Sequence, residues 1–197
     1  MRIDWSILIC HIKRGAHMKC KCTELLMQEH KTILRMMNIL SEMARKSDER
    51  LIKEDVLAIL EILRAFADEL HQGKEEGALF PVFMAACGTS EGNAVRHMIF
   101  EHNQDRSLME GIEDAVRNSD AGNFAQYANR LVEILRTHIY KEDSILFEFV
   151  NKTLSPEDDS KVVAGFENYD RDFQQRGHAE LLRRLQSLEW KYLGKVA

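Results

Sequence analysis

Residues that interrupt helices are scarce in this sequence, which has only two prolines and ten glycines among 197 residues. Proline removes a backbone hydrogen-bond donor and glycine weakens helices, so their scarcity leaves most of the chain free to be helical. Alternating apolar and polar runs bounded by hairpin turns are absent as well, which argues against a sheet. An all-α chain is therefore predicted.

Positive charge is not in excess either, since the formal net charge is -5 at pH 7. Because the sequence has no excess of lysine and arginine, nucleic acid is not expected as a partner. Long apolar runs are also missing: the stretch Trp5–Cys10 is far shorter than the roughly 20 residues of a membrane-spanning helix, and it lacks a signal-peptide cleavage site. No membrane association is predicted, and a cytoplasmic location is expected.

Cysteine is scarce too. Cys10, Cys20, Cys22 and Cys87 are irregularly spaced, so free thiols are expected rather than a disulfide framework. Cys20 and Cys22 could hold a metal or sense the redox state, but residues 1–22 are better interpreted as a poorly ordered leader.

Helical periodicity dominates the rest of the chain. Four amphipathic segments carry apolar residues at helical spacing, over about 23–46, 53–80, 93–118 and 123–150. Thr23 is the expected N-cap of the first segment, a break or kink is expected after Phe80 because Pro81 follows, and residues 86–92 are the clearest loop. Short connections between four such helices predict an up-down-up-down bundle over residues 23–152.

One further helix is predicted from Ser155, where a serine cap, Pro156 at the first helical position and two acids form a strong helix start. This helix belongs to residues 153–197 and has no counterpart elsewhere in the chain. It is expected to pack across the bundle or against a second subunit or protein partner. His178, within it, is expected at the surface.

An internal repeat carries the residues with metal-binding chemistry. The pattern His-x3-Glu occurs in the second segment and again in the fourth, and a Glu-His pair occurs in the first segment and again in the third. Side chains at i and i+4 of a helix share one face, so an imidazole and a carboxylate can reach one point. The six candidate metal ligands are His30, His71, Glu75, His102, His138 and Glu142.

Each of these elements also has an ordinary structural explanation. A histidine on an apolar face usually makes one satisfied hydrogen bond, and His-x3-Glu on a helix surface is commonly a weak side-chain pair. Glu75 and Glu142, however, fall on apolar stripes, where an unpaired carboxylate would cost several kcal/mol. Two copies with the same flanks therefore favour a metal site. Imidazole suits zinc, copper, iron or nickel, and carboxylates can bridge two harder ions.

Other known motifs fit poorly. The ferritin-like di-iron bundle needs Glu-x-x-His on two helices, but the residues three before His71 and His138 are Asp68 and Leu135. The sequence also lacks His-Glu-x-x-His, glycine-rich phosphate loops and nucleophile elbows.

The order of the motifs resembles the hemerythrin-like HHE cation-binding domain over about residues 23–150. The resemblance rests on Glu-His at 29–30, His-x3-Glu-Glu-x-x-Leu-Phe-Pro at 71–81, Glu-His at 101–102 and His-x3-Glu at 138–142. It implies a four-helix bundle with an oxo- or hydroxo-bridged pair of non-haem iron ions. It further implies that the four histidines are terminal ligands and that Glu75 and Glu142 bridge the two irons.

Two features depart from the oxygen carriers that this chain resembles. Those proteins have a fifth histidine one turn from the third-helix ligand, which this chain lacks, and their second bridging acid lies five residues after its histidine, which here is Asp143. Glu142 is preferred because it matches the first repeat, with Asp143 as the alternative. His97 lies about 140° from His102 around the helix and is expected to be exposed.

These residues and the resemblance predict a di-iron protein that binds or senses dioxygen, nitric oxide or peroxide at open metal positions. Two alternatives stay open. One is an enzyme that processes peroxide or nitric oxide or repairs iron centres, and the other is an iron-storage or regulatory module that signals through the C-terminal helix. The sequence shows no dedicated substrate pocket or proton relay, so a binding protein is favoured over a dedicated enzyme.

Overall fold

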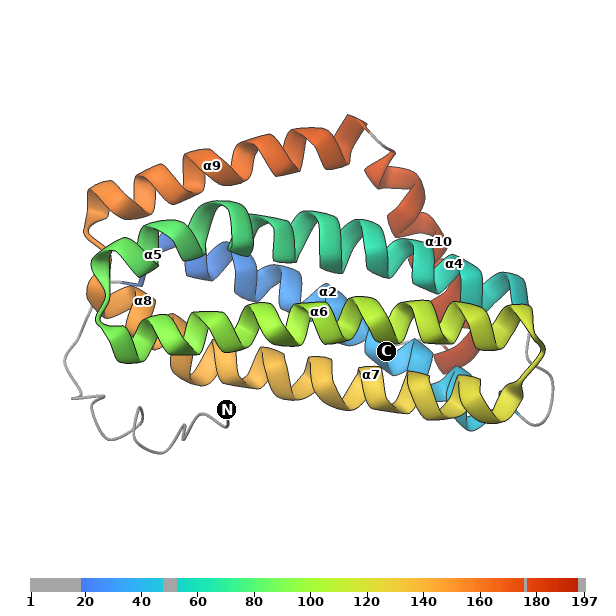
Figure 1. Cartoon of the computed structure of the whole chain (residues 1–197). Helices are drawn as coiled ribbons and strands as arrows, with labels where there is room; N and C mark the ends of the chain where they lie inside the picture. Colours follow the sequence, from blue (N-terminus) through green and yellow to red (C-terminus); the bar gives the residue numbers. More distant parts are fainter. Residues whose placement is uncertain (1–18, 48–52, 176, 195–197) are drawn as a thin grey trace.

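The computed structural model describes residues 19–47, 53–175 and 177–194. Within those ranges every regular element is a helix and no strand occurs, so the predicted all-α class is confirmed. Four long helical paths lie side by side, and each runs opposite to the one before it (Figure 1). The paths are α2 (Lys21–Arg45); α4 (Lys53–Leu63) with η1 (Arg64–Gln72), η2 (Glu75–Leu79) and α5 (Phe80–Ala86); α6 (Thr89–Arg117); and α7 (Ala121–Lys141) with η3 (Glu142–Leu146) and α8 (Phe147–Thr153).

The second path stays helical through Pro81, so of the break or kink expected after Phe80 the break does not occur. Pro81 lies in the first turn of α5, directly after the π-helical turn η2. Proline cannot donate to the carbonyl four residues back, here that of Gly77, and its ring crowds that carbonyl. A π turn bonds five residues back and is wider, so it accommodates the proline without ending the helix.

The helices also begin earlier than the sequence predicts. α2 starts at Lys21, with Cys20 rather than Thr23 as its N-cap, and α6 starts at Thr89 after a link of only two residues. Thr23 lies inside α2, where its hydroxyl donates to the carbonyl of Cys20. Residues 1–18 of the expected leader lie outside the described residues.

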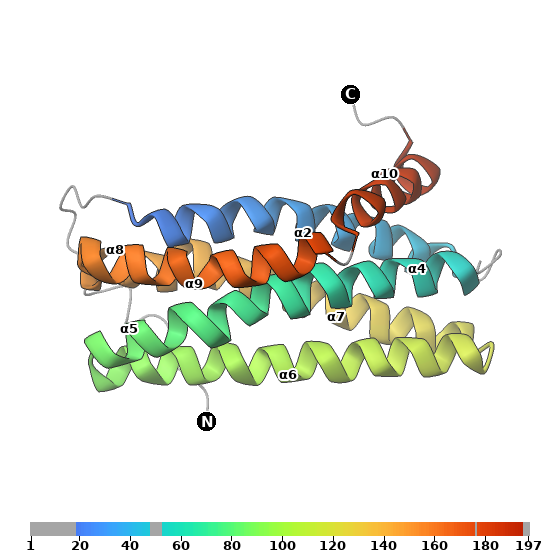
Figure 2. The ribbon, with the colours of Figure 1, turned by 90° about the horizontal axis from the view of Figure 1, so that it is seen from above.

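The chain after the bundle forms two helices where one was predicted, α9 (Pro156–Gln175) and α10 (His178–Leu193). They are separated at Gly177, whose φ of 95° is a left-handed conformation that does not continue an α-helix. Figure 2 shows α9 lying along the bundle and α10 turning across α2 and α4. Packing on the bundle is one of the arrangements that the sequence predicted. The side chain of His178 is outside the described residues.

The apolar core forms two clusters, one toward each end of the bundle. The larger cluster fills the end where α4 begins and includes Met36, Leu60 and Ile112. The smaller cluster fills the end at α5 and α8 and includes Leu26 and Phe83. Between them lies a layer of buried polar side chains. None of the described helices has a stretch long and apolar enough to cross a membrane.

Candidate metal centre

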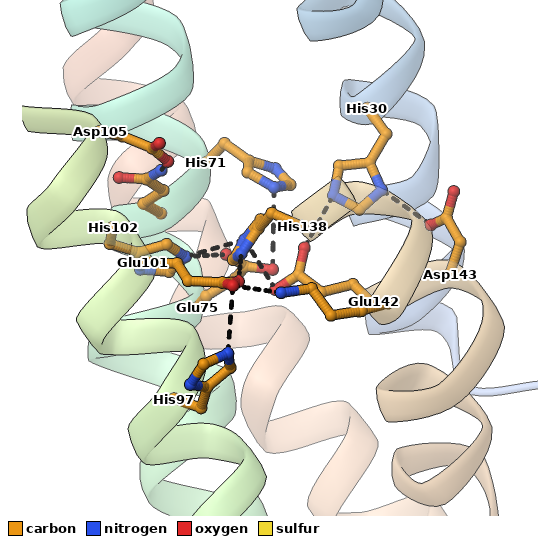
Figure 3. A network of polar contacts seen from close by, with 12 residues as sticks. His30, His71, Glu75, His97, Glu101, His102, Asp105, His138, Glu142 and Asp143 are labelled. Carbon is orange, nitrogen blue, oxygen red and sulfur yellow. Dashed lines mark hydrogen bonds and ion pairs between the residues drawn. The ribbon is translucent and has the colours of Figure 1, made fainter. Parts of the chain in front are cut away.

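All six predicted ligand residues meet in this buried polar layer, which draws on all four helical paths (Figure 3). None of the six is more than 2% exposed. Their imidazole nitrogens and carboxylate oxygens form two groups, and within each group the ligand atoms lie within 4.8 Å of one another. Each group has two histidines, and both share the same two glutamates. The groups are His30, His71, Glu75 and Glu142, and His102, His138, Glu75 and Glu142.

Local helix geometry brings two successive acids into this layer in each half of the repeat. Glu75 is the first residue of the π turn η2, and Glu142 is the first residue of the π turn η3. π turns are rare and often mark functional sites. In both copies the first acid faces the other ligand atoms, and the next acid, Glu76 or Asp143, contacts a histidine of the opposite half.

A carboxylate holds the Nδ1 atom of each of the four histidines. Since a carboxylate only accepts hydrogen bonds, each Nδ1–H donates, and the Nε2 atom of each ring faces the centre. Such partners fix the ring orientation of metal-bound histidines. The pairs are His30 with Asp143 at 2.7 Å, His71 with Glu29 at 2.9 Å, His102 with Glu76 at 2.7 Å and His138 with Glu101 at 2.9 Å.

This arrangement separates the positions of Glu142 and Asp143. The side chain of Asp143 is 31% exposed and faces the outer nitrogen of His30, whereas Glu142 is fully buried among the ligand atoms. The geometry therefore favours Glu142 as the shared acid. His97 was predicted to be exposed, but its side chain is only 24% exposed and its Nε2 lies 3.1 Å from Glu101.

Two buried lysines neutralise two of the outer carboxylates, Glu29 and Glu101, and the sequence analysis missed them. Lys74 donates to Glu29 at 2.5 Å and to Asp170 of α9 at 2.6 Å, and Lys141 donates to Glu101. Each lysine lies three residues after a ligand histidine, so the repeat is His-x2-Lys-Glu-acid. That shared lysine was the signal that could have identified them.

Several ligand atoms have no hydrogen-bond partner: Nε2 of His30 and His71, and both carboxylate oxygens of Glu75 and Glu142. Unpaired buried polar groups are costly unless a partner is supplied. One type of partner satisfies imidazole lone pairs and carboxylate oxygens together, namely a cation. The residues present therefore fit a metal ion on an observation independent of their sequence pattern.

Glu142 is the better compensated of the two shared acids. Its oxygens lie 3.2 Å from Nε2 of both His30 and His138. Burial alone would raise the pKa of Glu142, but His138 and His30 outweigh it and hold that pKa well below the usual range. Burial likewise opposes charge on His138, yet Glu142 and Glu101 raise its pKa well above 6.5.

Glu75 lacks such partners. Its oxygens lie 3.7 Å from Nε2 of His71 and 3.5 Å from that of His102. Burial lowers the pKa of His71 to about 4 and also lowers that of His102, so neither supplies a positive charge near neutral pH. Burial and the neighbouring Glu142 raise the pKa of Glu75 well above its usual value. Two facing carboxylates with too little positive charge are an arrangement that a divalent cation neutralises.

A third group of ligand-type atoms lies where α2 meets α9, formed by Cys20, Cys22 and Asp159. The two oxygens of Asp159 already accept hydrogen bonds from the backbone N–H groups of Lys21 and Cys22. Burial raises the pKa of Cys20 to about 11, so this thiol is protonated at neutral pH. The cluster is therefore explained as a cap on α2.

The family model described as the hemerythrin HHE cation binding domain matches residues 22–150. The matched region contains all six candidate ligands and ends before α9. Among curated proteins and among solved structures, none matches this chain significantly.

Proposed function

Because this chain belongs to the hemerythrin HHE cation-binding domain family, we propose that it is a non-haem di-iron protein that binds or senses a small ligand such as dioxygen, nitric oxide or peroxide. The observation that carries the proposal is the set of buried, unpartnered ligand atoms at which two groups of histidines share Glu75 and Glu142. Each histidine pair would hold one iron, and the two glutamates would bridge them.

The donor set supports iron. Each position offers two imidazole nitrogens and oxygens of two shared carboxylates, without a thiolate. Zinc in a structural site is satisfied by four tetrahedral ligands, whereas non-haem iron is commonly held by histidines and carboxylates with positions left open for a small ligand. When bound, such an iron pair supplies reversible binding of the ligand or electron transfer to it.

The residues around the centre restrict what can reach it. The six ligand side chains are almost fully buried, so water and large substrates are excluded. A surface hollow of about 420 Å³ includes His30 and Asp143 in its lining, so the surface comes close to the centre on that side. The outer carboxylates accept the hydrogen bond of each Nδ1–H, and Lys74 and Lys141 hold two of them, Glu29 and Glu101, in place.

Metal analysis of anaerobically purified protein, with an optical spectrum before and after air, tests the proposal. We expect about two irons per chain and a charge-transfer band that changes on oxidation. His71→Ala and Glu142→Ala should lose metal, while His97→Ala, a half-buried histidine outside both ligand groups, should keep it. Protein without iron, whose two ligand variants have the same metal content as the parent, would contradict the proposal.

Peroxide consumption separates the binding function from the enzymatic alternative. A binding or sensing protein should consume peroxide in proportion to its iron pairs. Consumption of many equivalents of peroxide per iron pair would instead favour an enzyme.

A further inference from the structure

The internal repeat is broken at one place beside the centre. Gln72 directly follows the ligand histidine of the second path, and Asp105 lies three residues after the ligand histidine of α6. At the matching positions of the other half the chain has Ile139 and Ile33. All four side chains are buried, with exposures between 1% and 4%. The two halves of the bundle therefore differ here in polarity and not in burial.

The polar pair is incompletely satisfied. Gln72 Nε2 lies 3.4 Å from Asp105 Oδ2, at the long end for a hydrogen bond, and Gln72 Oε1 and Asp105 Oδ1 have no partner at all. Buried polar atoms left in this state destabilise a fold. Since Ile33 and Ile139 occupy the equivalent positions in the other half, packing of the bundle does not require polar groups here. The pair therefore calls for a partner other than the protein itself.

The position of the pair suggests what that partner is. Figure 3 shows Asp105 beside His102 and on the same side of the cluster as His71, one histidine from each ligand group. Asp105 is not a member of either group, so its oxygens lie outside the set of converging ligand atoms. Asp105 thus lies beside the ligand histidines without being one of the converging groups, and its contact with Gln72 brings the amide to the same side.

We propose that Gln72 and Asp105 form the hydrogen-bonding side of the small-ligand site and orient a ligand that donates or accepts hydrogen bonds, such as peroxide or a small anion. This inference rests on the proposed function. The pair would act as positioning residues: the Gln72 amide and the Asp105 carboxyl group would hydrogen-bond to a ligand held at the centre. The side formed by Ile33 and Ile139 offers no such contact. Peroxide is thereby favoured over dioxygen, which accepts hydrogen bonds weakly.

The experiment uses the ferric full-length protein and azide as the probe. In the double variant Gln72→Ile/Asp105→Ile, both sides of the centre carry isoleucine. We expect it to keep the iron content of the parent and to bind azide about three- to tenfold more weakly, the effect of losing about one net hydrogen bond. Asp105→Asn keeps a hydrogen-bonding group and should retain most of the affinity. Ile33→Val, the matched control on the apolar side, should bind azide like the parent.

Several results would overturn the inference while leaving the proposed function intact. Azide affinity that is unchanged or tighter in the double variant, with iron retained, would make the pair purely structural. Loss of iron in Asp105→Asn would make Asp105 a metal ligand. A parent protein that binds no iron would instead contradict the proposed function itself. Unfolding of the metal-free variants in urea identifies any variant that has lost its fold. If the double variant has, the single variant Gln72→Ile carries the comparison and should bind azide more weakly than the parent, and unchanged affinity with iron retained would again make the pair purely structural.

Discussion

Replacing Glu142 by glutamine should destabilise the metal-free protein more than replacing Glu75 by glutamine, although the two residues occupy equivalent positions in the repeat. The oxygens of Glu142 lie 3.2 Å from the Nε2 atoms of His30 and His138, whose pKa values are raised. The oxygens of Glu75 lie 3.7 and 3.5 Å from the other two histidines, whose pKa values are lowered. Glu142 therefore faces the two histidines whose charged forms are favoured, and Glu75 faces the two whose charged forms are disfavoured.

The expected magnitudes follow from this difference. Removing one partner of a buried ion pair costs about 3 to 5 kcal/mol. Glu142→Gln should therefore lower the free energy of unfolding at pH 7 by about 3 kcal/mol. This is the lower end of that range, because His30 and His138 can release their protons once the carboxylate is gone. Burial and the neighbouring Glu142 raise the pKa of Glu75 well above its usual value, which favours its neutral carboxyl form in the metal-free protein. Glu75→Gln replaces that group by a neutral amide of similar shape and should change stability by no more than about 1 kcal/mol.

Urea unfolding in the presence of a chelator measures both values. With a slope of about 2 kcal/mol per molar urea, Glu142→Gln should shift the midpoint down by about 1.5 M. Glu75→Gln should leave the midpoint close to that of the parent. Both variants should lose metal, because each removes an acid common to the two ligand groups. Equal midpoint shifts in the two variants would refute the reasoning.

Three further predictions concern other parts of the structure. Glu29→Gln weakens the hold on His71 Nδ1, so metal affinity should fall by about 10- to 100-fold at unchanged stoichiometry, as measured by competition with a chelator. Burial lowers the folded-state pKa of His71 from 6.5 to about 4, so the metal-free protein should lose about 3 kcal/mol of stability as the pH falls from 6.5 to 4. Urea titrations at a series of fixed pH values measure this loss, which should be absent in His71→Asn. Gly165→Ala places a Cβ 2.9 Å from Ala78 Cβ and should destabilise the protein by about 1 to 3 kcal/mol in thermal unfolding, despite better helix propensity. At Gly92 the nearest atom to an added Cβ is 3.8 Å away, so Gly92→Ala should gain stability. A loss of stability in both variants would show that the contact with Ala78 does not cause the destabilisation of Gly165→Ala.

The helical class and the convergence of the ligands follow from local rules. Helical periodicity puts His71 above Glu75, and His138 above Glu142, on inward faces whatever the rest of the chain does. Burial of those acids then demands compensation by positive charge. Two helical pairs with the same pattern were enough to predict that six side chains meet, and the structure brings them together.

Contacts between helices were beyond such rules. Asp143 binds His30 from 113 residues away, and the periodicity of neither helix shows which side chain of another helix will lie opposite. The wide turns at Glu75 and Glu142 and the bend at Gly177 likewise follow from packing and from one backbone angle.

The sequence by itself determined that each ligand histidine and its acid share one inward helix face, because helix geometry acts over four residues. Only the tertiary structure decided which atom each of them meets. That choice depends on how whole helices settle against one another, and it gave Glu142 the inner position and Asp143 the outer one.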